Sequence, residues 1–320
     1  MSILDLNPKR HSATLEETLA GTLEGTLAHL DALVGFDTQN PPRAIESASP
    51  IFRYLQDALS GFEFEYFDAG NGCIGLLALR GQPSLLFNFH IDTVPICAGW
   101  ETHPHRLEVT RDTQIAEPAS QVHESCVARA VGLGACDIKG AVACMLQAAS
   151  QTDGPLALLF TSDEENGNSA AVRLFLAQNK AFNAVVVAEP TQGKAILAHR
   201  GIETARARFS GLSGHGSESR TLHDNAIHKA ANWTHKALSW IQEQGFSYQM
   251  LEGLPFNVGK IQGGIKANMI AAECELTFGF RPLPGQNGQA LLTELQELAM
   301  SKESLQLTPG FTGPTLPAAN

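Results

Sequence analysis

The sequence is short of positive charge. It carries 22 Lys and Arg residues against 33 Asp and Glu residues, which gives a formal net charge of −11 at pH 7. A protein that binds nucleic acid or an anionic membrane surface needs a basic surface to neutralise phosphate groups. We therefore expect neither a nucleic-acid partner nor a membrane partner.

Long apolar runs and closely paired cysteines are also missing. No apolar run approaches the roughly 20 residues that a helix needs to cross a bilayer, and the first ten residues are polar and unlike a signal peptide. The six cysteines are scattered without a C-x-x-C pair, which is typical of reduced thiols rather than of a disulfide framework or a zinc knuckle. These absences predict a cytoplasmic protein.

Helix and strand signals alternate over the first two thirds of the chain. A capping box at 14–17 opens a helix with leucines at helical spacing up to Gly35. Strands separated by helices predict an α/β domain with a mostly parallel sheet. The further helices are expected at 51–59, 141–149 and 169–178, and the strands at 63–67, 74–80, 84–89, 156–161 and 184–188.

The pattern changes after about Gly201 to that of a small α+β domain with an antiparallel sheet. Strands are expected there at 202–209 and 271–281, and helices at 224–244 and 289–300. The polar, irregular segment 112–130, which contains Pro118, is expected to be a surface loop insertion.

His90 and Asp92 stand two residues apart at the end of the apolar run 84–89. Side chains at positions i and i+2 of a strand point the same way. An imidazole at such a strand end can bind a metal, and a carboxylate beside it can accept the far ring N–H and hold the tautomer. Alone, the pair is a weak signal, because most such pairs are capped or solvated.

Asp137 follows a glycine-rich run at 132–134 that superficially resembles a dinucleotide-binding loop. Its carboxylate stands where a pyrophosphate would bind, so repulsion argues against a nucleotide and favours a cation. The alternative is that Asp137 caps the following helix.

Glu164 and Glu165 follow the apolar strand at 156–161, and Glu189 follows the valines at 185–187. A solvated loop is the alternative for the charge run. Adjacent glutamates can also divide two tasks, one binding a metal while the other takes a proton from water. With His90 and Asp137, these acids predict a metal site at the carboxyl edge of the sheet, where open α/β sheets bind ligands.

Four longer stretches, 36–45, 197–202, 263–270 and 278–284, occur in order around these motifs. Together they resemble the dinuclear zinc family of acetylornithine deacetylases, succinyl-diaminopimelate desuccinylases, aminoacylases and glutamate carboxypeptidases, and within it the N-acetylcitrulline deacetylase branch. The resemblance runs from about Leu15 to Pro317. It implies a metallohydrolase catalytic domain, 1–202 with a short return at 311–320, and an inserted α+β lid (dimerisation) domain, 203–310.

The resemblance also implies a homodimer, two Zn²⁺ or Co²⁺ ions per subunit, and roles for single residues. Arg281 suits a substrate carboxylate because its planar fork donates two parallel hydrogen bonds. The implied first-metal ligands are His90, Asp137 and Glu189, and those of the second metal are Asp137 and Glu165. The implied general base is Glu164, and Asp92 is the residue that holds His90. In the lid domain, His215 is implied to reach the site of the partner subunit. Asn268 and Arg281 of the lid are implied to bind the substrate.

The family's catalytic domain ends with further strands and helices that carry a C-terminal His ligand of the second metal. This sequence ends at Asn320 and has no histidine after His235. The second metal is therefore expected to have Asp137, Glu165 and water, unless His123 replaces the missing ligand. Apolar surface of the sheet is also expected to be exposed.

The expected function is metal-dependent hydrolysis of the N-acetyl group of N-acetylcitrulline or N-acetylornithine in arginine biosynthesis. Glu164 would activate a water molecule, and His215 of the other subunit would polarise the acetyl oxygen. The alternatives are an inactive, truncated member that only binds metal and an amino acid, and a dipeptidase or carboxypeptidase of the same family.

Overall fold

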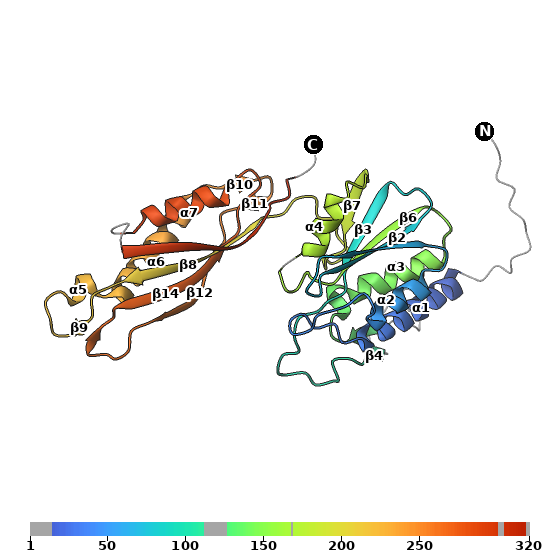
Figure 1. Ribbon diagram of the computed structural model, residues 1–320, viewed down its shortest axis with the longest axis horizontal. Helices are drawn as coiled ribbons and strands as arrows, with labels where there is room; N and C mark the ends of the chain where they lie inside the picture. Colours follow the sequence, from blue (N-terminus) through green and yellow to red (C-terminus); the bar gives the residue numbers. More distant parts are fainter. Residues whose placement is uncertain (1–14, 112–126, 168, 300–303, 318–320) are drawn as a thin grey trace, which may run out of the picture. The chain divides into compact units, whose positions relative to one another are not determined.

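The computed structural model describes residues 15–111, 127–167, 169–299 and 304–317 (Figure 1). The chain divides into two compact units, Met1–Gly193 and Lys194–Asn320. The division falls after Gly193, whereas the sequence predicted a domain boundary at 202.

A five-stranded sheet in the order β1-β2-β6-β3-β7 forms the centre of the first unit. Its strands are β1 (Glu63–Asp68), β2 (Ile74–Arg80), β3 (Leu85–His90), β6 (Leu156–Thr161) and β7 (Ala184–Val187). Strand β3 runs parallel to β6 and β7, while β2 is antiparallel to both β1 and β6. The sheet is therefore mixed rather than mostly parallel. The connection from β1 to β2 is too short for a parallel pair, which needs a crossover of a dozen or more residues.

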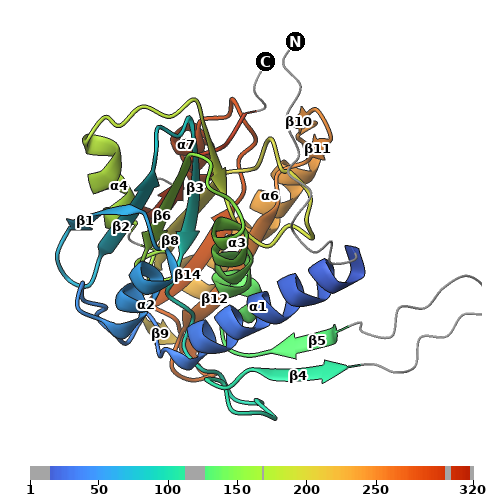
Figure 2. The same cartoon turned by 90° about the vertical axis from the view of Figure 1, so that its right-hand side faces the viewer.

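Helices cover both faces of this sheet (Figure 2). On one face, α1 (Leu15–Gly35), α2 (Pro50–Ala58) and α3 (Gly140–Ser150) pack against side chains such as Leu76. On the other face, α4 (Ala170–Ala177) packs against Leu77. Successive strand residues point to opposite faces, so the run of apolar residues in β2 serves both cores. The α/β assignment of this unit is confirmed.

Strand β7 lies at an edge of the sheet and has apolar side chains that remain exposed. Val185, Val186 and Val187 are 43–57% exposed. Near-continuous apolar runs are typical of strands that are covered on both faces. The apolar surface expected on the sheet is therefore present at β7.

A two-stranded antiparallel ribbon, β4 (Glu108–Arg111) and β5 (Val127–Val131), precedes the irregular helical turn η1 (Ala135–Lys139). The expected loop insertion at 112–130 is wrong at its end, because residues 127–130 pair with β4. Residues 112–126, including His123, lie outside the described residues.

The second unit is built on a four-stranded antiparallel sheet in the order β12-β14-β8-β15. Its strands are β8 (Ile202–Ser210), β12 (Phe256–Gly263), β14 (Glu273–Phe280) and β15 (Leu305–Gly313). Helices α6 (Ala226–Glu243) and α7 (Gly288–Glu297) share its core, in which buried Trp233 donates a hydrogen bond from Nε1 to the Leu295 carbonyl at 2.8 Å. The predicted α+β unit is confirmed.

Three features of this unit were not expected from the sequence. Strands β12 and β15 were not predicted. Residues 311–313 belong to β15 of this sheet, where a return to the first domain was expected. Short elements also occur: α5 (Thr221–Asp224), and the two-residue pairs β9 (Gly214–His215) with β13 (Met269–Ile270) and β10 (Ser247–Tyr248) with β11 (Leu251–Glu252).

None of the helices in the described parts of the chain combines the length and the apolar character that crossing a membrane requires.

Candidate functional site

His90 ends strand β3 and is almost completely buried, with 4% of its surface exposed. Its Nε2 atom lies 2.9 Å from Asp137 Oδ1 and 4.0 Å from Glu189 Oε1. Its Nδ1 atom lies 3.0 Å from the backbone oxygen of Asp92, and 3.6 Å from the carboxylate oxygen Oδ1 of the same residue. The nearer acceptor for the far ring nitrogen is thus the carbonyl of Asp92 rather than the carboxylate that the sequence analysis expected.

His90, Asp137 and Glu165 each offer one ligand atom, and these atoms lie within 4.8 Å of one another. Glu165 follows β6 and Asp137 lies in η1, 47 residues after His90. The fold therefore brings together residues that the sequence had placed at separate strand and helix ends. The family resemblance implies one metal held by His90, Asp137 and Glu189 and a second held by Asp137 and Glu165, so both sets share Asp137.

The buried carboxylate of Asp92 holds the turn that carries the two glutamates. Its Oδ1 accepts the backbone N–H of Glu164 at 3.3 Å, and its Oδ2 accepts that of Glu165 at 3.0 Å. Asp92 is fully buried. It therefore fixes the position of the acidic turn relative to the end of β3, a role that spacing within the sequence could not indicate.

Gly134 allows the Asp137 turn to approach the segment that follows β3 closely. Its φ angle is +74°, in the left-handed region that favours glycine, and a Cβ atom there would lie 2.5 Å from Thr93 Cγ2. Asp137 does not cap α3, which begins at Gly140 with no side-chain cap bond. The helix-cap alternative for Asp137 is therefore wrong.

The charges of the cluster perturb one another. Burial lowers the pKa of His90, but the carboxylates of Asp92, Glu189 and Asp137 raise it to about 10. Burial raises the pKa values of Glu164, Glu165 and Glu189, His90 opposes that rise, and the neighbouring carboxylates add to it. So many acids around one imidazole create a strong attraction for a cation.

The donor set fits a divalent cation. One imidazole nitrogen and several carboxylate oxygens are ligands that Zn²⁺ accepts, and catalytic zinc sites combine these types. His90 is buried while the side chains of Asp137 and Glu189 are 50% and 43% exposed. A cation held between them would be accessible to a small substrate.

Two buried residues beside the cluster were missed as functional candidates. Asn40 is 6% exposed and Lys139 is 1% exposed. Lys139 donates a hydrogen bond from Nζ to the Phe36 carbonyl at 2.9 Å. The only signal in the sequence was position, because Asn40 lies in the stretch 36–45 and Lys139 follows Asp137 by two residues.

In the second unit, the structure brings His215 and Asn268 together. His215 lies in β9 opposite Met269 of β13, and the N–H of Gly216 donates to the Asn268 carbonyl at 2.8 Å. The exposed ring of His215 has Nδ1 2.7 Å from Ser217 Oγ. These contacts present the imidazole on the surface of its unit.

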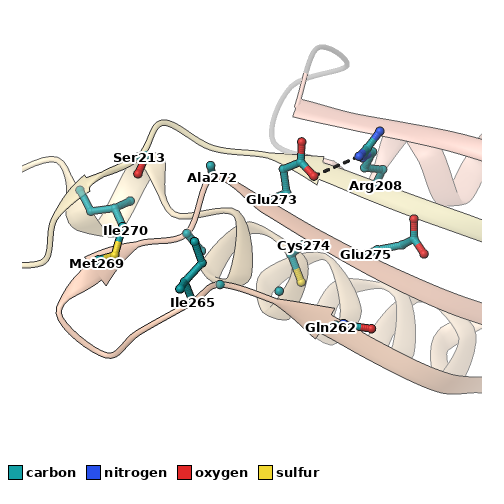
Figure 3. Close-up of a pocket in the computed structure, with 13 residues that line it drawn as sticks. Arg208, Ser213, Gln262, Ile265, Met269, Ile270, Ala272, Glu273, Cys274 and Glu275 are labelled. Carbon is teal, nitrogen blue, oxygen red and sulfur yellow. Dashed lines mark hydrogen bonds and ion pairs between the residues drawn. The ribbon is translucent and has the colours of Figure 1, made fainter.

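Arg281 lies apart from this pair, just after β14, in a groove of about 400 Å³ that includes Pro255 and Thr204. A different groove of about 560 Å³ lies beside β13 and β14 (Figure 3). There Arg208 donates to Glu273 at 3.0 Å, and Ile265 and Met269 add apolar surface. Within the second unit, Arg281 therefore does not lie beside His215 and Asn268.

Comparisons with known proteins agree with this arrangement. Residues 197–304 match the model of the peptidase dimerisation domain of the M20 family. N-acetyl-L-citrulline deacetylase from Xanthomonas campestris is 43% identical over 299 residues, which are 93% of this chain and 77% of that protein. Acetylornithine deacetylase from Myxococcus xanthus is 30% identical over 316 residues, which are 90% of this chain and 76% of that protein.

Solved structures share the fold. The aminopeptidase PepT from Bacillus cereus matches with a TM-score of 0.69 and 17% identity, over 93% of this chain and 78% of that one. An M20 family metallo-carboxypeptidase from Sulfolobus solfataricus matches with a TM-score of 0.61 and 13% identity, over 91% and 78% of the two chains. The deacetylase relatives, together with this donor set, define a metal-dependent amide hydrolase. The chain belongs to the M20 family, in the group that contains N-acetyl-L-citrulline deacetylase and acetylornithine deacetylase.

Proposed function

We propose that this protein hydrolyses the N-acetyl group of an N-acetyl-amino acid of arginine biosynthesis, with N-acetyl-L-citrulline as the first candidate substrate and N-acetylornithine as the second. The observation that carries the proposal is the convergence of His90, Asp137 and Glu165 beside Glu164, on a chain 43% identical to an N-acetyl-L-citrulline deacetylase.

In this proposal the cation is Zn²⁺ or Co²⁺. His90, Asp137 and Glu189 hold the first ion, and Asp137 and Glu165 contribute to the second. When bound, such a cation acts as a Lewis acid toward the acyl oxygen and lowers the pKa of water. The short distances from His90 Nε2 to Asp137 and Glu189 support the first ligand set.

Glu164 is the proposed general base. It takes a proton from the attacking water and returns that proton to the nitrogen of the leaving amine, so the amide C–N bond breaks while a C–O bond forms. Burial raises the pKa of its carboxyl group, which brings it closer to the operating pH of a base that must also act as an acid. Asp92 holds the backbone N–H of Glu164 and so orients this side chain.

The second unit contributes to substrate binding and assembly. We propose a cytoplasmic homodimer in which His215 of one subunit stabilises the developing oxyanion in the site of the other. Asn268 and Arg281 bind the substrate, with the Arg281 guanidinium on its carboxylate. The match to a dimerisation domain and the exposed position of His215 support this arrangement.

The test is acetate release by the purified chain with added Zn²⁺ or Co²⁺. We expect turnover of N-acetyl-L-citrulline, N-acetylornithine or both, and a loss of about 10²–10⁴-fold in kcat for Glu164→Gln, as is typical when a general base is removed. Glu63→Gln, an exposed change on β1, is the matched control. Cleavage of dipeptides without acetate release would indicate a peptidase. Cation binding without any turnover would indicate a binding protein.

A further inference from the structure

The acidic cluster is held by a segment that contains none of its ligands. Between α1 and α2, residues 36–40 contact the parts of the chain that carry the site. The backbone N–H of Asn40 donates to the Thr93 carbonyl at 2.9 Å, and that of Thr93 donates to the Thr38 carbonyl at 3.0 Å. The carbonyl of Phe36 accepts the hydrogen bond from Lys139, two residues beyond Asp137. This segment therefore links the end of β3 to the turn that carries Asp137.

The side chain of Asn40 makes the most direct of these links. Its Nδ2 atom donates to the Ser162 carbonyl at 2.8 Å and lies 3.4 Å from Asp92 Oδ2. Asn40, Asp92 and Ser162 are all buried. One amide group thus contacts both the carboxylate that holds the acidic turn and the first residue of that turn.

The chemistry of the amide suits this position. Asp92 Oδ2 also accepts the N–H of Glu165, so the Asn40 amide approaches a carboxylate whose oxygens already face Glu164 and Glu165. A neutral hydrogen-bond donor beside a buried carboxylate stabilises the charged form of that carboxylate. Unlike a positively charged side chain, it does not form an ion pair that would draw the carboxylate away from the N–H groups of Glu164 and Glu165. An acid at position 40 would face Asp92 with a like charge.

We propose that Asn40 is a positioning residue of the metal site. Through Asp92 and Ser162 it sets the distance between His90 and the Glu164–Glu165 turn, and so controls cation affinity. This inference rests on the proposed function only in assuming that the cluster binds a divalent cation. Residues that orient metal ligands in this way typically contribute 10–100-fold in metal affinity.

The experiment compares Asn40→Asp with wild type and with a matched variant, Asn88→Asp. Asn88 lies on β3, and its Nδ2 donates to the Leu159 carbonyl of β6 at 3.2 Å. Both substitutions replace an amide that bonds a backbone carbonyl of the same part of the chain, but only Asn40 contacts Asp92. Co²⁺ affinity is measured by calorimetric titration, the visible spectrum of bound Co²⁺ is recorded, and the thermal midpoint without cation is determined.

We expect Asn40→Asp to weaken Co²⁺ binding by about 10–100-fold and to change the Co²⁺ spectrum. Asn88→Asp should lower the thermal midpoint while leaving affinity and spectrum near those of wild type. If Asn40→Asp does not fold, Asn40→Ser, which retains a small donor, should show a smaller loss of affinity.

Wild-type affinity and spectrum in the Asn40 variants would overturn the inference. The inference would also be overturned if Co²⁺ affinity fell in proportion to the drop in thermal midpoint, and to the same extent in the Asn40 and Asn88 variants. Failure of the wild-type protein itself to bind Co²⁺ would instead contradict the proposed metal site.

Discussion

Nε2 of His90 lies 2.9 Å from Oδ1 of Asp137, although 47 residues separate the two in the chain. The opposite ring nitrogen is turned toward the Asp92 carbonyl. The imidazole is thereby held in one orientation, with Nε2 facing Asp137 and Glu189. This orientation is the one required if Nε2 is to bind a cation that Asp137 also binds.

Binding of a cation at this point should stabilise the folded chain. At a free Zn²⁺ or Co²⁺ concentration 100 times the dissociation constant, we expect a gain of about 2.7 kcal/mol in the free energy of unfolding. Asp137→Ala should lose most of this gain, because it removes the ligand nearest to His90. Asp153→Asn, an exposed change in a loop, should retain it. Scanning calorimetry with and without the cation measures the effect, and an equal gain in the Asp137 variant would contradict the assignment.

The buried amine of Lys139 should make stability depend on pH. Burial lowers the pKa of Lys139 to about 8, while Asp37 and Asp92 act in the opposite direction. Between pH 8 and the ordinary Lys value near 10.4, the unfolded chain binds more protons than the folded one. The contribution of Lys139 to the free energy of unfolding therefore rises with pH in this window, while the contribution of His90, whose pKa in the folded chain is raised to about 10, falls with pH. At about 1.4 kcal/mol per pKa unit, the contribution of Lys139 is at most on the order of 3 kcal/mol.

Urea unfolding at pH 8 and pH 10 tests this dependence. The change in the free energy of unfolding between these pH values should be more positive in wild type than in Lys139→Met, and it should stay at the wild-type value in Lys180→Met, in which the replaced amine is partly exposed and paired with Glu65. The same pH slope in wild type and in Lys139→Met would show that the amine is not the origin of the effect.

Mixing two inactive variants tests the proposed exchange of His215 between subunits. His215→Ala and Glu164→Gln should each release little acetate alone. In a heterodimer, one of the two sites has an intact Glu164 and receives an intact His215 from the other subunit. With random exchange in a symmetric dimer, the mixture should reach about one quarter of wild-type activity. Activity no higher than that of the separate variants, in a mixture shown to exchange subunits, would mean that His215 acts within its own chain or not at all.

The elements that the sequence predicted well are those with strong local patterns. Strands β2 and β6 have the predicted bounds, 74–80 and 156–161, because each is a continuous apolar run between turn residues. Strand β15 was missed because its sequence, which includes Pro309 and Gly310, disfavours a strand. It forms at the edge of the sheet with an irregularity between Pro309 and Thr312, where a proline is tolerated. Its partner, β8, is about a hundred residues away, so no local pattern could reveal the pairing.

The candidate site shows the same difference between what local sequence patterns predict and what the packing of distant segments decides. His90, Asp137, Glu164, Glu165 and Glu189 could be selected because each is a polar side chain that directly follows an apolar or glycine-rich run. Their grouping could not be predicted in detail. The sequence predicted one metal site at the carboxyl edge of the sheet, but only the folded chain shows that the ligand atoms of His90, Asp137 and Glu165 lie within 4.8 Å of one another.

The sequence by itself determined which side chains stand at the ends of the strands and that they are acids and an imidazole, because hydrophobic periodicity is a local property. Tertiary structure alone decided that β3 and β6 lie side by side in parallel. This pairing brings the Asp92 carboxylate within hydrogen-bonding distance of the backbone N–H groups of Glu164 and Glu165. It alone also decided that Asn40 and Lys139 are buried beside them. Burial and hydrogen bonding between distant segments depend on the packing of the whole unit, and no short stretch of sequence contains that information.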